Sequence, residues 1–275
     1  AQRPGMTRTI CLRLAYEGTR YSGWQAQPGR LTVQGMLAEA IRGVSGEELR
    51  PRGSSRPDAG VHAREQVVAF TTESLLEPAV WVRAINAKLP PDITVLSGCE
   101  VATDFSPTRA AAWKRYRYRI HDAPWRPVLK RHLVWRWKTR LDGPAMQAAA
   151  TALVGEHDFT SFETTPSTRL SKVRTIHSLS VFRQSVPDDA PGAELWIEVE
   201  GNGFLHNMVR IIAGSLVLGG ACRRYPAWLA TALAAQSRAA AGPTAPPEGL
   251  VLVSTHIETD RDTPPWQNSP NSSER

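Results

Sequence analysis

The chain has 275 residues, of which 41% are hydrophobic and 21% charged, and a formal net charge of +7. This apolar content can bury a core and excludes an intrinsically disordered chain, while the length suits one large domain or two ordinary ones. The longest apolar run, residues 211–222, contains three glycines and falls short of the ~18 residues typical of a membrane span.

The number and spacing of the cysteines indicate whether the protein works in an oxidising or a reducing compartment. Cys11, Cys99 and Cys222 are far apart in the sequence and form no Cys-x-x-Cys pair. This spacing argues against a disulfide framework or a zinc ribbon and favours a reducing compartment. The first residues precede a predicted strand and do not resemble the apolar core of a signal peptide. We therefore expect a cytoplasmic protein without a membrane segment.

The positive charge is concentrated in one segment. Residues 109–140 contain eleven Lys or Arg and one acid, Asp122, so they carry +10 and the rest of the chain carries 7 − 10 = −3. Six Trp and Tyr residues interleave with these charges, a mixture suited to phosphates and unstacked bases. The alternative is an amphipathic strand pair with a solvated basic face. The candidate phosphate contacts are Lys130, Arg131, Arg136 and Lys138.

The first part of the chain predicts two strand-helix-strand units. Alternating apolar residues from Ile10 to Tyr16 indicate a strand, and Thr32 is placed to cap the helix that follows. Pro78 opens a second helix, which Pro90-Pro91 ends. The remaining strands are predicted at 66–70 and 93–101. Residues 8–108 are thus expected to form an N-terminal α+β half.

A second α+β half is expected over residues 109–258. Asp142 is placed to cap a helix, and Asn202 with Gly203 suggests the start of another, which runs through the apolar residues after Arg210. Residues 153–162 read as a loop. Strands are predicted around Tyr116 and at 132–137, 174–182, 194–199 and 250–257. Residues 259–275 lack periodicity and are expected to be a disordered tail.

The segment Gly53–Ala63 combines features of a reactive loop. Asp58 has small neighbours that allow close approach of a substrate, and Arg56 lies two residues away to keep the carboxylate ionised. Pro57 restricts the approach to it, and Gly60 supplies a bend. An ordinary surface turn is the alternative, because Pro-Asp and Ala-Gly are common turn pairs.

Two other kinds of site, for a metal ion and for a nucleotide phosphate, have less support in the sequence. Asp58 with His62, or His157 with Asp158, suggests a metal site, but no third ligand has a recognisable spacing, so no metal is predicted. The loop 18–23 could hold a phosphate, yet it lacks a nucleotide-binding fingerprint, and its Tyr21, with Trp24 just after it, suits RNA contact or packing better.

Five motifs in order resemble the TruA family of tRNA pseudouridine synthases. They span the chain from about residue 8 to 257 and comprise Tyr16-Glu17-Gly18-Thr19 with Tyr21-Ser22-Gly23-Trp24-Gln25, Arg56-Pro57-Asp58-Ala59-Gly60-Val61-His62-Ala63, Arg115-Tyr116-Arg117-Tyr118, His157-Asp158-Phe159-Thr160-Ser161-Phe162 and Gly203-Phe204-Leu205-His206-Asn207-Met208-Val209-Arg210. The resemblance implies the pseudouridine synthase fold, in which two α+β halves share an extended, mostly antiparallel sheet with a basic cleft between them. It also implies a cofactor-free homodimer that isomerises uridine at positions 38, 39 and 40 of the tRNA anticodon stem-loop.

The resemblance assigns roles to four residues. Asp58 becomes the catalytic aspartate, Arg56 and Arg210 its arginine partners, and Tyr116 the tyrosine that stacks on the target base. Without the resemblance, the sequence favours Tyr116 as a core residue of its strand. Whether Asp58 acts as nucleophile or base stays open. Two other functions also stay open, a noncatalytic RNA-binding protein and a metal-dependent nuclease. Pro57, Ser55 and the run 105–109 depart from the family's usual residues. These departures leave Asp58 in place but bear on the RNA contacts, and hence on which of the neighbouring uridines is modified.

Overall fold

The structure is a computed structural model and describes residues 7–164, 170–185, 194–225 and 227–258. These residues form two compact units, the first made of residues up to Trp113 together with those from Leu252 onward, and the second of Lys114–Val251. The expected halves, 8–108 and 109–258, assign the last strand to the second half, whereas from Leu252 onward it groups with the first unit. The predicted tail, 259–275, lies outside the described residues.

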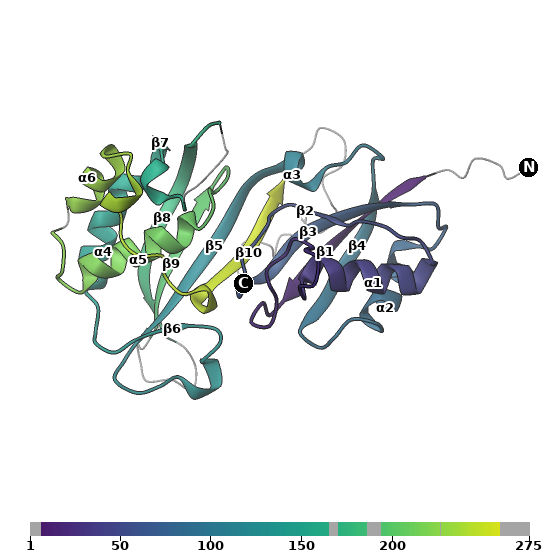
Figure 1. The fold of residues 1–275 in the computed structure, drawn as a ribbon, viewed down its shortest axis with the longest axis horizontal. Helices are drawn as coiled ribbons and strands as arrows, with labels where there is room; N and C mark the ends of the chain where they lie inside the picture. Colours follow the sequence, from purple (N-terminus) through teal and green to yellow (C-terminus); the bar gives the residue numbers. More distant parts are fainter. Residues whose placement is uncertain (1–6, 165–169, 186–193, 226, 259–275) are drawn as a thin grey trace, which may run out of the picture. The chain divides into compact units, whose positions relative to one another are not determined.

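The first unit contains a sheet flanked by helices. Its strands are ordered β4-β1-β3-β10, with β2 pairing to β3. Helices α1 and α2 lie side by side on one face of these strands (Figure 1). The bounds are β1 Arg8–Tyr16, α1 Val33–Ser45, β2 Arg52–Gly53, β3 His62–Thr72, α2 Pro78–Asn86, β4 Ile93–Val101, α3 Pro107–Ala110 and β10 Leu250–Ile257.

The second unit has its own strands and helices. Its strands are ordered β5-β9-β8-β7, with β6 pairing to β5. Helices α4, α5 and α6 gather together, and α4 packs on β8 (Figure 1). The bounds are β5 Ala111–Asp122, β6 Trp135–Trp137, α4 Gly143–Ala150, β7 Gly155–Asp158, β8 Val173–Gln184, β9 Glu194–Gly201, α5 Met208–Gly220 and α6 Trp228–Ala234. The predicted α+β class is confirmed, and because β6 runs parallel to β5 while the other strand pairs described are antiparallel, the sheet is mixed.

Local signals in the sequence correctly placed the starts of helices α1, α2 and α4. The Thr32 hydroxyl accepts a hydrogen bond from the Gly35 amide at 3.3 Å, and the Asp142 carboxylate accepts one from the Ala145 amide at 2.9 Å, so both predicted caps are confirmed. Pro78 stands at the first helical position of α2.

Two boundary predictions were wrong. The helix expected to start at Asn202 and Gly203 begins at Met208, because the side chain and backbone of Asn202 bond to Thr175 of β8 at 3.0 and 3.1 Å and so extend the sheet. The presumed loop 153–162 contains strand β7, paired with β8, and a short 3-10 turn, Thr160–Phe162. In both places a sheet partner distant in sequence decides the local structure.

The fold brings two cysteines together. Cys11 of β1 and Cys99 of β4 are direct partners across the antiparallel pair, although 88 residues separate them, and both are free thiols. Hydrogen bonding to Cys99 and burial raise the pKa of the Cys11 thiol well above its ordinary value. Cys11 is therefore a protonated residue of the core cluster that also contains Val67, Ala69 and Phe105.

Candidate functional site

The Asp58 loop is fastened to the loop between β1 and α1. The Trp24 amide donates to the Pro57 carbonyl at 3.0 Å, and the Gly60 amide donates to the Tyr21 carbonyl at 3.2 Å. Within the loop, the Val61 amide donates to the Asp58 carbonyl at 3.1 Å. The backbone on either side of Asp58 is thus held on both flanks, while its side chain stays partly exposed. Such fixation is what a reactive carboxylate requires.

Two glycines make this close crossing possible. Gly23 has a φ of 89°, and a Cβ on it would lie 2.8 Å from the Pro57 carbonyl oxygen; a Cβ on Gly18 would lie 1.9 Å from that of Val61. Side chains at either position would push the two loops apart. Tyr21 and Trp24 are only 2% and 1% exposed, so of the two roles considered for them the structure supports packing.

The histidine of this loop has a structural contact. His62 is buried, and its Nδ1 accepts a hydrogen bond from the Gly18 amide at 2.9 Å. An imidazole that accepts through Nδ1 is neutral and carries its proton on Nε2. Across the part of the chain that the structure describes, no three His, Cys, Asp or Glu side chains gather in a way that could hold a metal ion.

A polar cavity of about 410 Å³ lies beside the Asp58 loop, within the first unit. Arg56, which precedes Pro57, is one of its lining residues and is itself exposed. The complete lining is Trp24, Gln25, Gln34, Arg50, Arg52, Gly53, Arg56, Ser106 and Thr108. The sequence reasoning missed Arg50 and Arg52 because they form a short basic pair outside the long basic segment.

Tyr116 and Arg210 belong to the second unit. Tyr116 of β5 is 8% exposed, and its ring packs edge-on against Phe204 with centroids 5.2 Å apart. Arg210 lies in the first turn of α5, where its Nε donates to the Ala245 carbonyl at 2.7 Å and its Nη1 to the Asn207 side-chain oxygen at 2.7 Å. Both side chains are therefore held in defined positions in their own unit.

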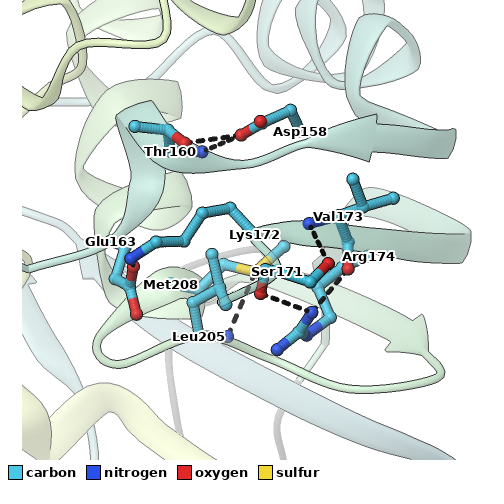
Figure 2. Close-up of polar contacts among 9 residues, drawn as sticks. All are labelled: Asp158, Thr160, Glu163, Ser171, Lys172, Val173, Arg174, Leu205 and Met208. Atoms are coloured by element: carbon cyan, nitrogen blue, oxygen red, sulfur yellow. Dashed lines mark hydrogen bonds and ion pairs between the residues drawn. The ribbon is translucent and has the colours of Figure 1, made fainter. Parts of the chain in front are cut away.

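The motif His157–Phe162 is structural in its described contacts. The Asp158 carboxylate accepts hydrogen bonds from the Thr160 amide at 2.8 Å and hydroxyl at 2.6 Å, which closes the turn after β7 (Figure 2). Lys172 forms an ion pair with the buried Glu163 in the same view. His157 Nε2 lies 2.9 Å from the Val154 carbonyl. These contacts explain the His and Asp of the motif without a metal ion.

The basic segment is partly neutralised inside the second unit. At least five of its eleven cations form ion pairs there: Arg115 with Glu200, Arg117 with Glu198, Arg119 and Lys130 with Glu194, and Arg140 with Asp122. Among the four candidate phosphate contacts, Lys130 has this partner, and Arg136 donates to the carbonyls of Trp125 and Pro124 at 3.3 and 2.7 Å. Arg131 and Lys138 are exposed. Fewer unpaired cations are thus available to an anionic partner than the sequence suggested.

Comparison with known proteins identifies the class. A model of the tRNA pseudouridine synthase family matches residues 14–107 and 149–256. The chain is 42% identical over 254 residues to tRNA pseudouridine synthase A of Myxococcus xanthus, with 92% of both chains covered. It is 44% identical over 247 residues to the protein of that name from Brevibacillus brevis, with 90% of this chain and 98% of that one covered.

These matches and the α+β fold define a pseudouridine synthase, which is an isomerase. The chain belongs to the tRNA pseudouridine synthase A (TruA) family. The motif resemblance is therefore confirmed. The family-matched stretches contain Arg56, Asp58 and Arg210, and Tyr116 lies between them. No helix in the described part of the chain is long and apolar enough to cross a membrane.

Proposed function

We propose that this protein isomerises uridine to pseudouridine in the anticodon stem-loop of tRNA, at positions 38, 39 and 40, with Asp58 as the catalytic residue. The observation that carries the proposal is the family match across most of the chain, which includes the Asp58 loop. The fixed backbone and partly exposed side chain of Asp58 support its role, since a residue that acts on the substrate must be both reachable and held in place.

The reaction needs an ionised carboxylate. The bond from the ribose C1′ to N1 of the uracil breaks, the base turns, and C1′ bonds to C5, while the hydrogen of C5 is released and N1 gains a proton. Asp58 either attacks the ribose as a nucleophile or removes a ribose proton, and in both roles it must be anionic. The isomerisation involves no net oxidation or reduction, so we propose no cofactor.

The position of Arg210 suits a cation that pairs with a functional carboxylate. It stands in the first turn of α5, where the positive end of the helix dipole disfavours a cation by about 0.3–1 kcal/mol. Its position is fixed by Asn207, which has the left-handed φ of 60° and also donates to the Thr164 hydroxyl at 2.9 Å. A cation maintained at an unfavourable place is consistent with a functional anion, and we assign Arg210 to the Asp58 carboxylate. Arg56, the second arginine that the resemblance implies for Asp58, forms no ion pair in the described part of the chain and lines the neighbouring cavity.

Tyr116 is proposed to stack on the target base. Removing a base from its stack costs a few kcal/mol, and contact with an aromatic ring recovers part of that energy. Its edge-on contact with Phe204 leaves the ring orientation fixed before the substrate arrives.

The homodimer implied by the resemblance is also a proposal. Light scattering of the purified protein would give the mass of the assembly directly.

The first prediction concerns Asp58→Asn. Asparagine keeps the shape and hydrogen-bonding capacity of the side chain but cannot act as an anionic nucleophile or base, so we expect tRNA binding to persist and pseudouridine formation to fall below detection. Release of tritium from C5 of labelled uridine measures the reaction. Asp104→Asn, an exposed aspartate of the first unit, is the matched control and should keep full activity.

Tritium release, tRNA binding and strand cleavage, measured together with and without EDTA, separate the alternative functions. Wild-type protein that binds tRNA without releasing tritium would indicate a noncatalytic RNA-binding protein, and strand cleavage that EDTA abolishes would indicate a metal-dependent nuclease. Tritium release by Asp58→Asn at the wild-type rate would refute the catalytic assignment while leaving the family unaffected.

A further inference from the structure

The cavity beside the Asp58 loop is strongly cationic. Arg50, Arg52 and Arg56 line it, and no Asp or Glu is among its lining residues. Arg50 and Arg56 form no ion pair with any residue in the described part of the chain, and Arg52 donates only to the Phe105 carbonyl, at 3.2 Å. Three guanidinium groups around one polar cavity repel each other unless an anion lies among them.

The walls of the cavity are held in place by hydrogen bonds. Gln34 is 4% exposed; its oxygen accepts from the Gln25 side chain at 2.8 Å and the Ala26 amide at 2.7 Å, and its nitrogen donates to the Pro51 carbonyl at 2.8 Å. Two further lining residues are joined by the Thr108 hydroxyl, which donates to the Gly53 carbonyl at 3.1 Å. These contacts preorganise the cavity, which lowers the entropy lost on binding.

The lining fits a nucleotide backbone. Guanidinium groups match phosphate oxygens in a bidentate arrangement, and the Gln25 amide with the Ser106 and Thr108 hydroxyls offers neutral partners for ribose hydroxyls. A volume of about 410 Å³ exceeds what a bare phosphate needs and falls within the range of small-ligand sites. The site therefore has room for a phosphate together with its sugar.

We propose that this cavity binds one phosphodiester and the adjoining ribose of the tRNA, next to the uridine that is modified. The inference rests on the proposed function for the identity of the RNA. Arg56 links the two sites, because it lines the cavity and only Pro57 separates it from Asp58, a span of at most about 7 Å between their Cα atoms. The cavity thereby fixes the RNA backbone beside the reacting nucleotide, and Arg50 and Arg52 act as positioning residues.

Phosphate-ethylation interference tests the proposal. A pool of tRNA ethylated at random phosphates is bound to the wild-type protein, to Arg50→Ala/Arg52→Ala and to Arg83→Ala. Arg83 is an exposed arginine of α2 outside the cavity. We expect wild-type binding to be impaired by ethylation at one or two phosphates beside the target uridine. In the double variant, ethylation at those phosphates should no longer impair binding, while interference at all other phosphates stays unchanged. The double variant should also bind unmodified tRNA at least ~10-fold more weakly, because charge-assisted hydrogen bonds are lost.

The results separate this site from the proposed function. An unchanged interference pattern in the double variant overturns the phosphate site, even if pseudouridine forms normally. The expected loss of interference supports the site, even if the wild-type protein forms no pseudouridine and the proposed function fails. If thermal melts show that inorganic phosphate stabilises the wild type but not the double variant, while tRNA interference is identical in both, the cavity binds free phosphate and the RNA assignment is overturned. Equal weakening by Arg83→Ala also overturns the specific site.

Discussion

At the scale of single residues, the Asp58 loop shows how backbone contacts can fix a reactive side chain. The carbonyl of Pro57 and the amide of Gly60 are both engaged by the loop that contains Tyr21 and Trp24. Neither contact uses the side chain of Asp58. These two contacts and the bond from the Val61 amide to the Asp58 carbonyl are made by the backbone, so Asp58→Asn should retain all three.

The second prediction is that Pro57→Thr costs up to about 1 kcal/mol of the free energy of unfolding and largely preserves activity. The proline restricts the unfolded chain, and its native contact with the Trp24 amide is made by the carbonyl, which threonine retains. Thermal melts and single-turnover kinetics measure the two effects, with Pro91→Thr in the exposed turn before β4 as the control. A tenfold change in rate without loss of folded protein would show that proline itself aims the carboxylate.

At the scale of secondary-structure elements, ion pairs between opposite charges join β5 and β9. The cross-strand register places Arg115 opposite Glu200 and Arg117 opposite Glu198, and both pairs form ion pairs. The Arg117 guanidinium also stacks over Trp196 of β9, 4.0 Å from the ring centroid. The alternating arginines of β5 thus stabilise the strand pair, an arrangement in which cross-strand opposite charges favour the register.

The third prediction follows from Glu194, whose side chain is buried. Burial alone would raise its pKa, but hydrogen bonds from Arg119 and Trp196 outweigh burial and hold the pKa below its ordinary value of 4.5. Because the folded-state pKa is lowered, the stabilisation is complete above pH 4.5 and is lost as the pH falls through the folded-state pKa.

Glu194→Gln should therefore lower the free energy of unfolding at pH 7, by about 2 kcal/mol. The difference from wild type should shrink as the pH is lowered below 4.5. Urea denaturation at a series of pH values measures it, with Glu39→Gln, an exposed residue of α1, as the control for removal of a carboxylate. A difference that stays constant from pH 7 to pH 3 would contradict the role of the ionised glutamate.

At the scale of the whole molecule, the net charge of +7 should still govern association with tRNA. The fourth prediction is that the Kd rises steeply with salt between about 50 and 200 mM, since each neutralised phosphate releases counterions. Arg131→Glu/Lys138→Glu removes exposed cations of the basic segment and should flatten this dependence, whereas Arg83→Glu on α2 should not. Salt titrations of tRNA binding decide it, and affinity independent of salt would exclude a phosphate-dominated interface.

The sequence by itself determined the features that depend on neighbouring residues. Hydrophobic alternation located β1, β8 and β9, and side-chain oxygens at Thr32 and Asp142 located two helix starts, because strand periodicity and helix capping involve residues within a few positions. The order of the motifs was also sufficient to indicate the family, which the comparisons confirmed.

Only the tertiary structure decided what distant segments do to one another. The sequence indicated +10 over residues 109–140, but four of these cations pair with Glu194, Glu198 and Glu200, which lie more than fifty residues further along and are brought near by strand pairing. The start of α5 was missed for the same reason, since Asn202 is held by β8. The arginine-lined cavity joins residues 24–34, 50–56 and 106–108, and no local pattern encodes such proximity, because it arises from packing between elements.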